Sequence, residues 1–133
     1  MGNYKQVIFT TEGVTVSVVS SYEAEVSNSD LARFVFSYQI EITNNTPYAI
    51  KLTHREWEIK DAVGRIKQVE GEGVVGVQPV IEPGESFSYS SWCPLPTQIG
   101  SMSGYYTIER LIDKVTFKVK IPKFTLISLA IQN

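Results

Sequence analysis

From Arg33 to Thr43, every second residue is apolar, and the positions between them are held by Val35 and by polar residues. Its apolar series consists of Phe34, Phe36, Tyr38, Ile40 and Ile42. Successive side chains of a β-strand point to opposite faces, so this period of two is typical of a half-buried strand. Burying one such side chain contributes about 1.5–3 kcal/mol as an upper bound. We therefore expect this strand at the centre of the core, in a fold built from strands.

Shorter stretches of the same alternation recur along the chain. They predict further strands at 14–18, 50–60, 65–69, 86–92, 102–108 and 115–121. In the second of these, the apolar phase changes between Leu52 and Trp57, which predicts a β-bulge among His54, Arg55 and Glu56. Segment 21–30 is polar and is expected to be a loop. The sequence Cys93-Pro94-Leu95-Pro96 is expected to break the strand before it.

These patterns predict an all-β fold. About seven short strands, with no convincing helical period, favour a sandwich of two β-sheets over a closed barrel. The 133 residues fit a single domain, 1–133, with a core at about 12–126 and a short C-terminal tail at 127–133. The composition, 43% hydrophobic and 20% charged, is that of an ordinary folded protein.

Charge and hydropathy exclude several classes of function. A net charge of -2 gives no general attraction for nucleic acid. No run approaches the roughly 18 apolar residues of a membrane-spanning helix. The start of the chain lacks the apolar segment of a secretory signal, and Cys93 is the only cysteine. We therefore expect a cytoplasmic protein without disulfides that binds neither nucleic acid nor membranes.

The sequence Gly71-Glu-Gly73-Val-Val-Gly76 has the form G-x-G-x-x-G of a dinucleotide-binding fingerprint. That fingerprint needs a helix after the glycines, whose N-terminus holds the pyrophosphate. Pro79 and the Pro83-Gly84 turn leave no room for such a helix. We expect the three glycines to serve backbone shape in a candidate binding loop. The alternative is a small-ligand site near this loop, for a nucleotide polyphosphate or a divalent cation.

Residues for catalysis or for metal binding are sparse. His54 is the only histidine, so one chain contains neither a two-histidine metal site nor a histidine relay. Cys93 precedes a proline and is expected to be a small buried side chain. The acidic residues near the turns could supply oxygen ligands, but their spacing matches no EF-hand and favours ordinary surface: Asp61, Glu70, Glu72, Glu82 and Glu85. We expect no enzymatic activity, no catalytic or metal-binding residues and no cofactor.

Two aromatic residues and the C-terminal run are candidates for an interaction surface. Tyr105 lies on the opposite side of its strand from Met102 and Tyr106, so its ring is expected to face outward. Trp92 is the second candidate. Leu129 and Ile131 could extend an edge strand and pair with another copy of the chain, or belong to a frayed final core strand.

Several blocks of the sequence together resemble the ApaG family. They are Arg33 to Tyr38, Trp57 with Asp61 and Gly64-Arg65, Gly71 to Gly76 with Gln78-Pro79, Pro83 to Phe87, Cys93 to Leu95, Gly104 with Tyr106, and Ile121 to Phe124. Each block alone is weak, whereas their order and spacing are specific.

The resemblance implies an immunoglobulin-like, fibronectin type III-like β-sandwich. It implies no established chemistry: genetic association links the family to cobalt and magnesium resistance and to a neighbouring diadenosine-tetraphosphate hydrolase. Fusions of the domain to eukaryotic F-box and polymerase-interacting proteins suggest a role in recognising proteins. We therefore expect a non-enzymatic protein-interaction module with an unidentified protein partner.

Overall fold

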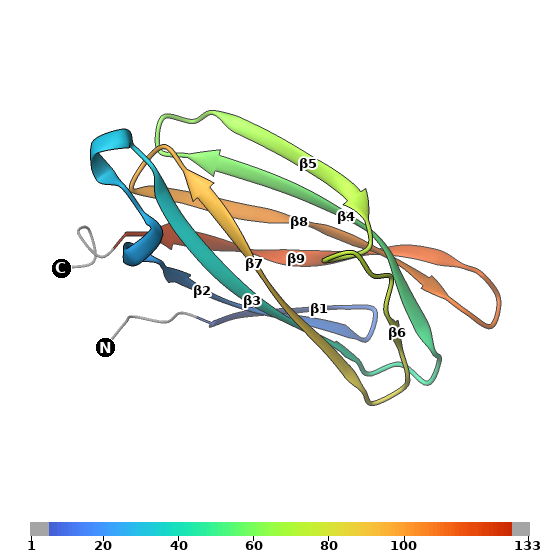
Figure 1. The fold of residues 1–133 in the computed structure, drawn as a ribbon. Coiled ribbons are helices and arrows are strands. Elements are labelled where there is room, and N and C mark those ends of the chain that lie inside the picture. The colour runs from blue at the N-terminus through green and yellow to red at the C-terminus, as the bar shows by residue number, and fades with distance from the viewer. Residues whose placement is uncertain (1–5, 129–133) are drawn as a thin grey trace.

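Two antiparallel β-sheets pack face to face in the computed structural model, which describes residues 6–128 (Figure 1). The first sheet has the strand order β1-β2-β3-β7, and the second has the order β5-β4-β8-β9, with β6 also paired to β4. The strands are β1 (Gln6–Thr11), β2 (Val14–Tyr22), β3 (Phe34–Asn44), β4 (Ile50–Asp61), β5 (Ile66–Glu72), β6 (Val80–Ile81), β7 (Ser86–Leu95), β8 (Ile99–Arg110) and β9 (Thr116–Ile127). The predicted sandwich is confirmed. The described residues form nine strands, two more than predicted. The sequence patterns missed β1 and the short β6 because neither carries a clear alternation.

The alternating row of β3 lies in the core, as predicted. All five of its apolar side chains are buried, and β3 pairs with β2 on one side and β7 on the other. Val35, on the opposite face, is buried as well, because the polar segment before β3 folds over it. Two short 3-10 turns occupy this segment, η1 (Ala24–Val26) and η2 (Ser29–Leu31). Ser27 Oγ accepts a hydrogen bond from the Val35 N–H, and the Glu23 N–H donates to the Val35 carbonyl, both at 2.8 Å.

Three aromatic rings join the two sheets across the core. Tyr38 of β3 lies 5.5 Å from Trp57 of β4 and 5.8 Å from Phe124 of β9, measured between ring centroids. Trp57 and Phe124 meet edge to face at 6.0 Å. Such pairs contribute about 0.5–1.5 kcal/mol beyond the burial of their surface. The triad therefore fixes how the sheets lie on each other.

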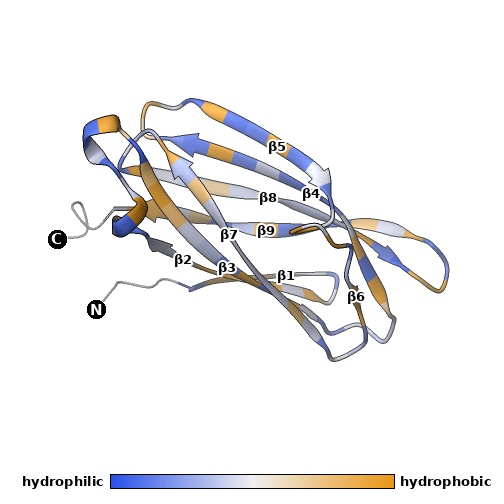
Figure 2. Cartoon of the chain, in the orientation of Figure 1, coloured by the Kyte–Doolittle hydropathy of each residue, from blue (hydrophilic) through white to orange (hydrophobic). Residues whose placement is uncertain are grey.

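The β-bulge of β4 lies at Thr53. The pairing of β4 with β8 shifts register between Leu52 and His54, so the prediction of a bulge among residues 54–56 was wrong by one residue. The same strand pairs with β5 from His54 to Lys60, and β5 extends to Glu72, beyond the predicted end at Val69. Apolar and polar residues alternate along β4 before and after the bulge, whereas β5 carries Ile66 and Val69 among polar residues (Figure 2).

Two prolines lie inside strands that were predicted to end before them. β7 continues through Pro94, which is opposite Val35 of β3, so the predicted break at Cys93 was wrong. A proline is tolerated there because β7 is the last strand of its sheet, and an edge strand needs hydrogen bonds on one side alone. β9 continues through Pro122, where its register with β8 shifts between Met102 and Gly104.

The sandwich is closed along one side. There the Lys120 N–H of β9 donates to Thr11 Oγ1 of β1 at 3.2 Å, and the Lys120 ammonium lies 5.3 Å from the centre of the Phe9 ring. Ser20 Oγ of β2 donates to the Thr125 carbonyl at 3.4 Å. The opposite side is bordered by the edge strands β5 and β7, and a cleft lies between them.

Candidate binding cleft

The glycine segment forms a tight hairpin turn after β5. The Val74 N–H donates to the Val77 carbonyl at 2.8 Å, and the Val77 N–H returns a bond to Val74 at 3.0 Å. The two central residues, Val75 and Gly76, have φ angles of 43° and 82°. Positive φ at both central positions is typical of two-residue hairpin turns and strongly favours glycine. The turn carries Val74 into the core, where it is fully buried.

The bulge of β4 holds this turn in place. The Thr53 carbonyl accepts hydrogen bonds from the Gly73 N–H at 2.7 Å and from Gln78 Nε2 at 2.9 Å. Gly73 has a φ of 59°, and a Cβ at this position would overlap the Val77 carbonyl oxygen. Gly71 lies inside β5, where a Cβ would come 2.7 Å from the Arg55 guanidinium. Gly73 and Gly76 therefore serve backbone shape, whereas Gly71 leaves room for the Arg55 side chain.

The turn lacks the features of a phosphate-binding loop. The N–H groups of Gly73, Val74 and Val77 already donate to carbonyl groups of the protein. The short β6 and the Glu82 to Glu85 turn follow the loop where a dinucleotide site needs a helix. A bound phosphate would therefore have to replace internal hydrogen bonds.

The cleft beside β5 has a volume of about 490 Å³. Its floor is formed by buried core residues, and its two walls are the edge strands. It is lined by Tyr38, Arg55, Trp57, Ile59, Asp61, Arg65, Ile66, Lys67, Val69, Ser91, Trp92, Cys93, Pro94, Leu95, Pro96 and Met102. This volume is within the usual range of ligand pockets, and apolar side chains with a few polar groups are typical of binding sites.

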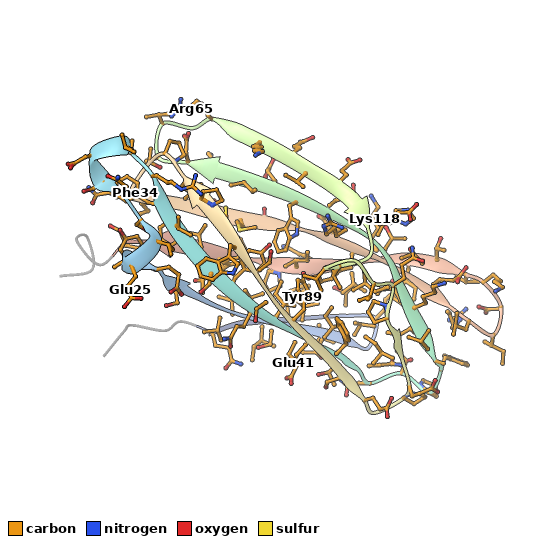
Figure 3. The ribbon with its side chains drawn as sticks, viewed as in Figure 1. Glu25, Phe34, Glu41, Arg65, Tyr89 and Lys118 are labelled. Atoms are coloured by element: carbon orange, nitrogen blue, oxygen red, sulfur yellow. The ribbon has the colours of Figure 1, made fainter. Side chains whose placement is uncertain are left out.

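Three cations line the cleft on its β4–β5 side. Arg55 and Lys67 lie on the inward-facing sides of their strands, in phase with Trp57 and Val69. Arg65 lies in the turn before β5, at one end of the cleft (Figure 3). The lining carries two more positive than negative charges, although the chain has a net charge of -2. The cleft therefore attracts negative groups.

Asp61 is the acidic residue of the cleft, and it is already engaged. Its carboxylate accepts hydrogen bonds from the N–H groups of Val63 and Arg65 at 3.0 Å, and from Arg65 Nε at 2.7 Å. Burial on its own would raise the pKa of the Asp61 carboxyl, but these donors and the charge of Arg65 hold that pKa below its usual value. Asp61 thus organises the turn before β5 and keeps Arg65 at the end of the cleft.

Arg55 is anchored at the opposite end of the cleft. Its Nη1 donates to the carbonyls of Glu72 and Gly73, at 3.0 Å each. In this position the Arg55 guanidinium occupies the space that a side chain at Gly71, its partner in β5, would take. The sequence patterns did not identify Arg55 or Lys67 as site residues. The sequence did contain a sign of them: each is a basic residue at a position of its strand where the alternation calls for an apolar one.

Trp92 is the exposed aromatic residue of the cleft, with 56% of its surface accessible. Tyr105, predicted as part of the same interaction surface, is not near it. Tyr105 lies on the outward face of β8, 45% exposed, with the Lys118 ammonium 5.9 Å from its ring centre. Both side chains are exposed, as expected for Tyr105, but the fold places them on different surfaces.

Titratable groups at the floor of the cleft are held neutral. Burial raises the pKa of the Cys93 thiol to about 11, and it raises the pKa of Tyr38 above its ordinary value. The hydroxyls of Tyr89 and Tyr106 share a hydrogen bond of 2.5 Å between the sheets, and burial raises the pKa of both. A neutral, buried thiol is a poor nucleophile. Cys93 is the small buried side chain that its position before Pro94 predicted.

Residues 6–128 contain no group of three or more histidine, cysteine or acidic side chains arranged to hold a metal ion. His54 is exposed on β4, with Nδ1 3.1 Å from Thr53 Oγ1. Cys93 belongs to the other sheet. Leu129 and Ile131, the candidates for pairing with another copy, lie outside the described residues. No helix within the described part of the chain is long and apolar enough to cross a membrane.

Comparisons with known proteins agree on one family. A family model described as the ApaG domain matches residues 24–110. Protein ApaG of Methylobacterium sp. (strain 4-46) is 47% identical over 116 residues, covering 87% of this chain and 88% of the relative. Protein ApaG of Brucella canis is 41% identical with the same coverage.

Solved structures show the same relationship. A crystal structure of an ApaA protein from Bordetella pertussis superposes with a TM-score of 0.84, at 40% identity, over 87% of this chain and 94% of that one. The C-terminal domain of Wzt shares the fold at 10% identity and a TM-score of 0.54, over 94% of this chain and 80% of that domain. From the family match, the identities and the shared fold, this chain belongs to the ApaG family.

Proposed function

We propose that the protein is a non-enzymatic interaction module that binds a partner protein in the cleft between β5 and β7. The observation that carries this proposal is the asymmetry of the sandwich. One side is closed by contacts of β9 with β1 and β2, whereas the other opens into a cleft with an exposed tryptophan and three cations. Exposed aromatic and arginine side chains are enriched at protein interfaces.

The chemistry of the described residues supports binding over catalysis. The buried Cys93 thiol is kept neutral, and His54 is exposed on the other sheet, where its Nδ1 lies 3.1 Å from the hydroxyl of the neighbouring Thr53. General acid-base or nucleophilic catalysis needs such groups within hydrogen-bond reach of each other. The proposal includes a cytoplasmic location, which suits a single cysteine without a disulfide partner in the chain.

The proposal is tested by affinity capture with crosslinking and mass spectrometry from the native cell. Trp92→Ala removes the exposed ring of the cleft, and Tyr105→Ala is the matched control, since it removes an exposed ring on the outward face of β8. We expect Trp92→Ala to lose a partner that wild type and Tyr105→Ala both retain. Equal capture by all three, or no enrichment over an unrelated β-sandwich, would contradict the proposal.

A second candidate function is the binding of a small anionic ligand. The presence of Trp92, Arg65 and Lys67 in one cleft favours it, because an aromatic ring and cations suit a nucleotide polyphosphate. We assign this candidate to the cleft instead of the glycine turn, because the N–H groups of Gly73, Val74 and Val77 already donate within the protein. Thermal unfolding with ATP or a dinucleoside polyphosphate tests it: a ligand-dependent stabilisation that Lys67→Glu abolishes would support it, and no stabilisation at millimolar ligand would exclude it.

A further inference from the structure

The free edge of β5 offers a second kind of contact in the cleft. β5 is the terminal strand of its sheet and pairs with β4 on one side only. An edge strand presents a row of backbone N–H and C=O groups that can pair with another extended segment. β5 borders the cleft with Ile66, Lys67 and Val69. An occupant of the cleft therefore meets backbone groups as well as side chains.

The facing edge, β7, is much less suited to pairing. Pro94 lies within it and Pro96 follows it, and neither residue has a backbone N–H to donate. Trp92, two residues before Pro94, lines the cleft from the same strand. We conclude that β7 acts as a wall of the cleft and that β5 is the strand available for pairing.

The charges along β5 select the chemistry of the occupant. Arg55 lies opposite Gly71, Lys67 lies near the other end of the strand, and Arg65 precedes it. The positive groups thus follow the length of the strand, which spans roughly 20 Å at about 3.3 Å per residue. Glu70 and Glu72 alternate with Val69 and Gly71 and so face the outward side of the sheet, away from the cleft. An occupant with carboxylates toward its ends would complement this arrangement.

The middle of the cleft selects an apolar side chain. Val69 lies on β5 between Lys67 and Gly71, the partner of Arg55, and Trp92 lines the cleft from the β7 side. An apolar or aromatic residue placed there would bury the exposed tryptophan ring, as the central anchor of an interface commonly does.

We infer that the occupant is an extended, acidic segment of the partner protein, with one apolar anchor between its carboxylates, and that it pairs through its backbone with β5. The inference rests on the proposed function and adds the mode of binding and the chemistry of the partner. It corresponds to strand addition at a sheet edge, in which backbone bonds supply affinity and alternate side chains supply specificity.

Selection from phage-displayed random peptides tests the chemistry. Wild type is compared with Lys67→Glu and with Lys60→Glu, which makes the same charge change on β4 outside the cleft lining. We expect wild type and Lys60→Glu to enrich acidic peptides. When the peptide most enriched by wild type is synthesised and its affinity is measured, Lys67→Glu should bind it at least about tenfold more weakly. Enrichment of basic peptides, or equal binding by all three proteins, would overturn the inference.

Backbone methylation of that peptide tests the mode. In a strand, alternate N–H groups point to the same side, so N-methylation at one set of alternate residues should abolish binding and at the other set should leave it intact. Amide hydrogen exchange should slow at alternate residues of 66–72. Equal effects of both methylated sets, or slowed exchange on β7 instead, would refute pairing with β5.

The inference and the proposed function fail in different ways. A Trp92-dependent partner captured from cells, together with no selection of acidic peptides, would leave the function standing and remove this mode. Inorganic triphosphate that shifts the amide signals of β5, while no peptide is selected, would assign the cleft to small anions and contradict both.

Discussion

Replacing Gly73 with alanine should be far more damaging than replacing Gly76, although both lie in the same turn. Gly73 has a φ of 59°, a conformation that costs a residue with a side chain about 1–2 kcal/mol. The added methyl would also overlap the Val77 carbonyl oxygen, which accepts the Val74 N–H. Losing that bond costs about 0.5–1.5 kcal/mol, and partly withdrawing buried Val74 adds about 1 kcal/mol or more. We expect Gly73→Ala to lower the free energy of unfolding by about 3–5 kcal/mol.

Gly76→Ala is the matched control. Its φ is also positive, at 82°, but no atom lies within 4 Å of the position of the new Cβ. The conformational cost remains and the overlap does not, so we expect a loss of about 1–2 kcal/mol. Urea denaturation followed by circular dichroism measures both. With a slope of roughly 2 kcal/mol per M, the midpoints of the two variants should differ by about 1 M.

The reasoning is refuted if the two midpoints coincide. That result would mean that the Val77 carbonyl moves aside at little cost and that Val74 does not depend on Gly73 for its burial. Unfolding slopes that differ between the variants would require the free energies to be recalculated before comparison. A Gly73→Ala variant that is too unstable to purify while Gly76→Ala behaves like wild type agrees with the predicted order.

Three other predictions concern buried polar groups. Stability should fall as the pH rises through about 9 to 11, because burial raises the pKa of the Cys93 thiol to about 11 and the unfolded chain releases that proton first. Urea midpoints measured across this pH range test it, and Cys93→Ala should make the midpoint depend less on pH. The lowered pKa of Asp61 means that its carboxylate stabilises the fold at any pH above the pKa of the unfolded chain. Asp61→Asn should therefore destabilise the protein at neutral pH and lose less stability than wild type below about pH 4. An unchanged melting temperature at acidic pH would contradict this. Asn44→Ala should cost about 2–4 kcal/mol in thermal melts, because its buried amide donates to Tyr48 and Ile81 at 2.7 and 2.9 Å; a loss below about 1 kcal/mol would show that water replaces it.

Local sequence patterns were sufficient to predict most of the fold. The alternation from Phe34 to Ile42 identified the central strand, because a strand with one buried face repeats every two residues whatever its neighbours are. Sequence patterns failed to predict where a strand ends or bulges when that depends on the neighbouring strand. Pro94 resembles a strand terminator, and only its place on an edge strand makes it acceptable. The bulge was placed near its true position, but its register depends on β8.

The binding cleft was beyond the reach of such patterns. It forms because β5 and β7, which belong to different sheets, lie as facing edges of the sandwich. Trp92 was identified as a surface residue, yet its place in one cleft with Arg55 and Lys67 depends on that topology. A basic residue in the apolar phase of a strand remains a readable sign that the buried face opens into a polar cleft.

The two tryptophans give the protein separate internal reporters. Trp57 is 5% exposed and packs between the rings of Tyr38 and Phe124, so its emission follows the integrity of the core. Trp92 is 56% exposed in the cleft, so its emission and its quenching by acrylamide follow occupancy of that surface. Trp92→Phe and Trp57→Phe isolate each signal in turn. Folding and cleft binding can therefore be observed optically in one unlabelled chain.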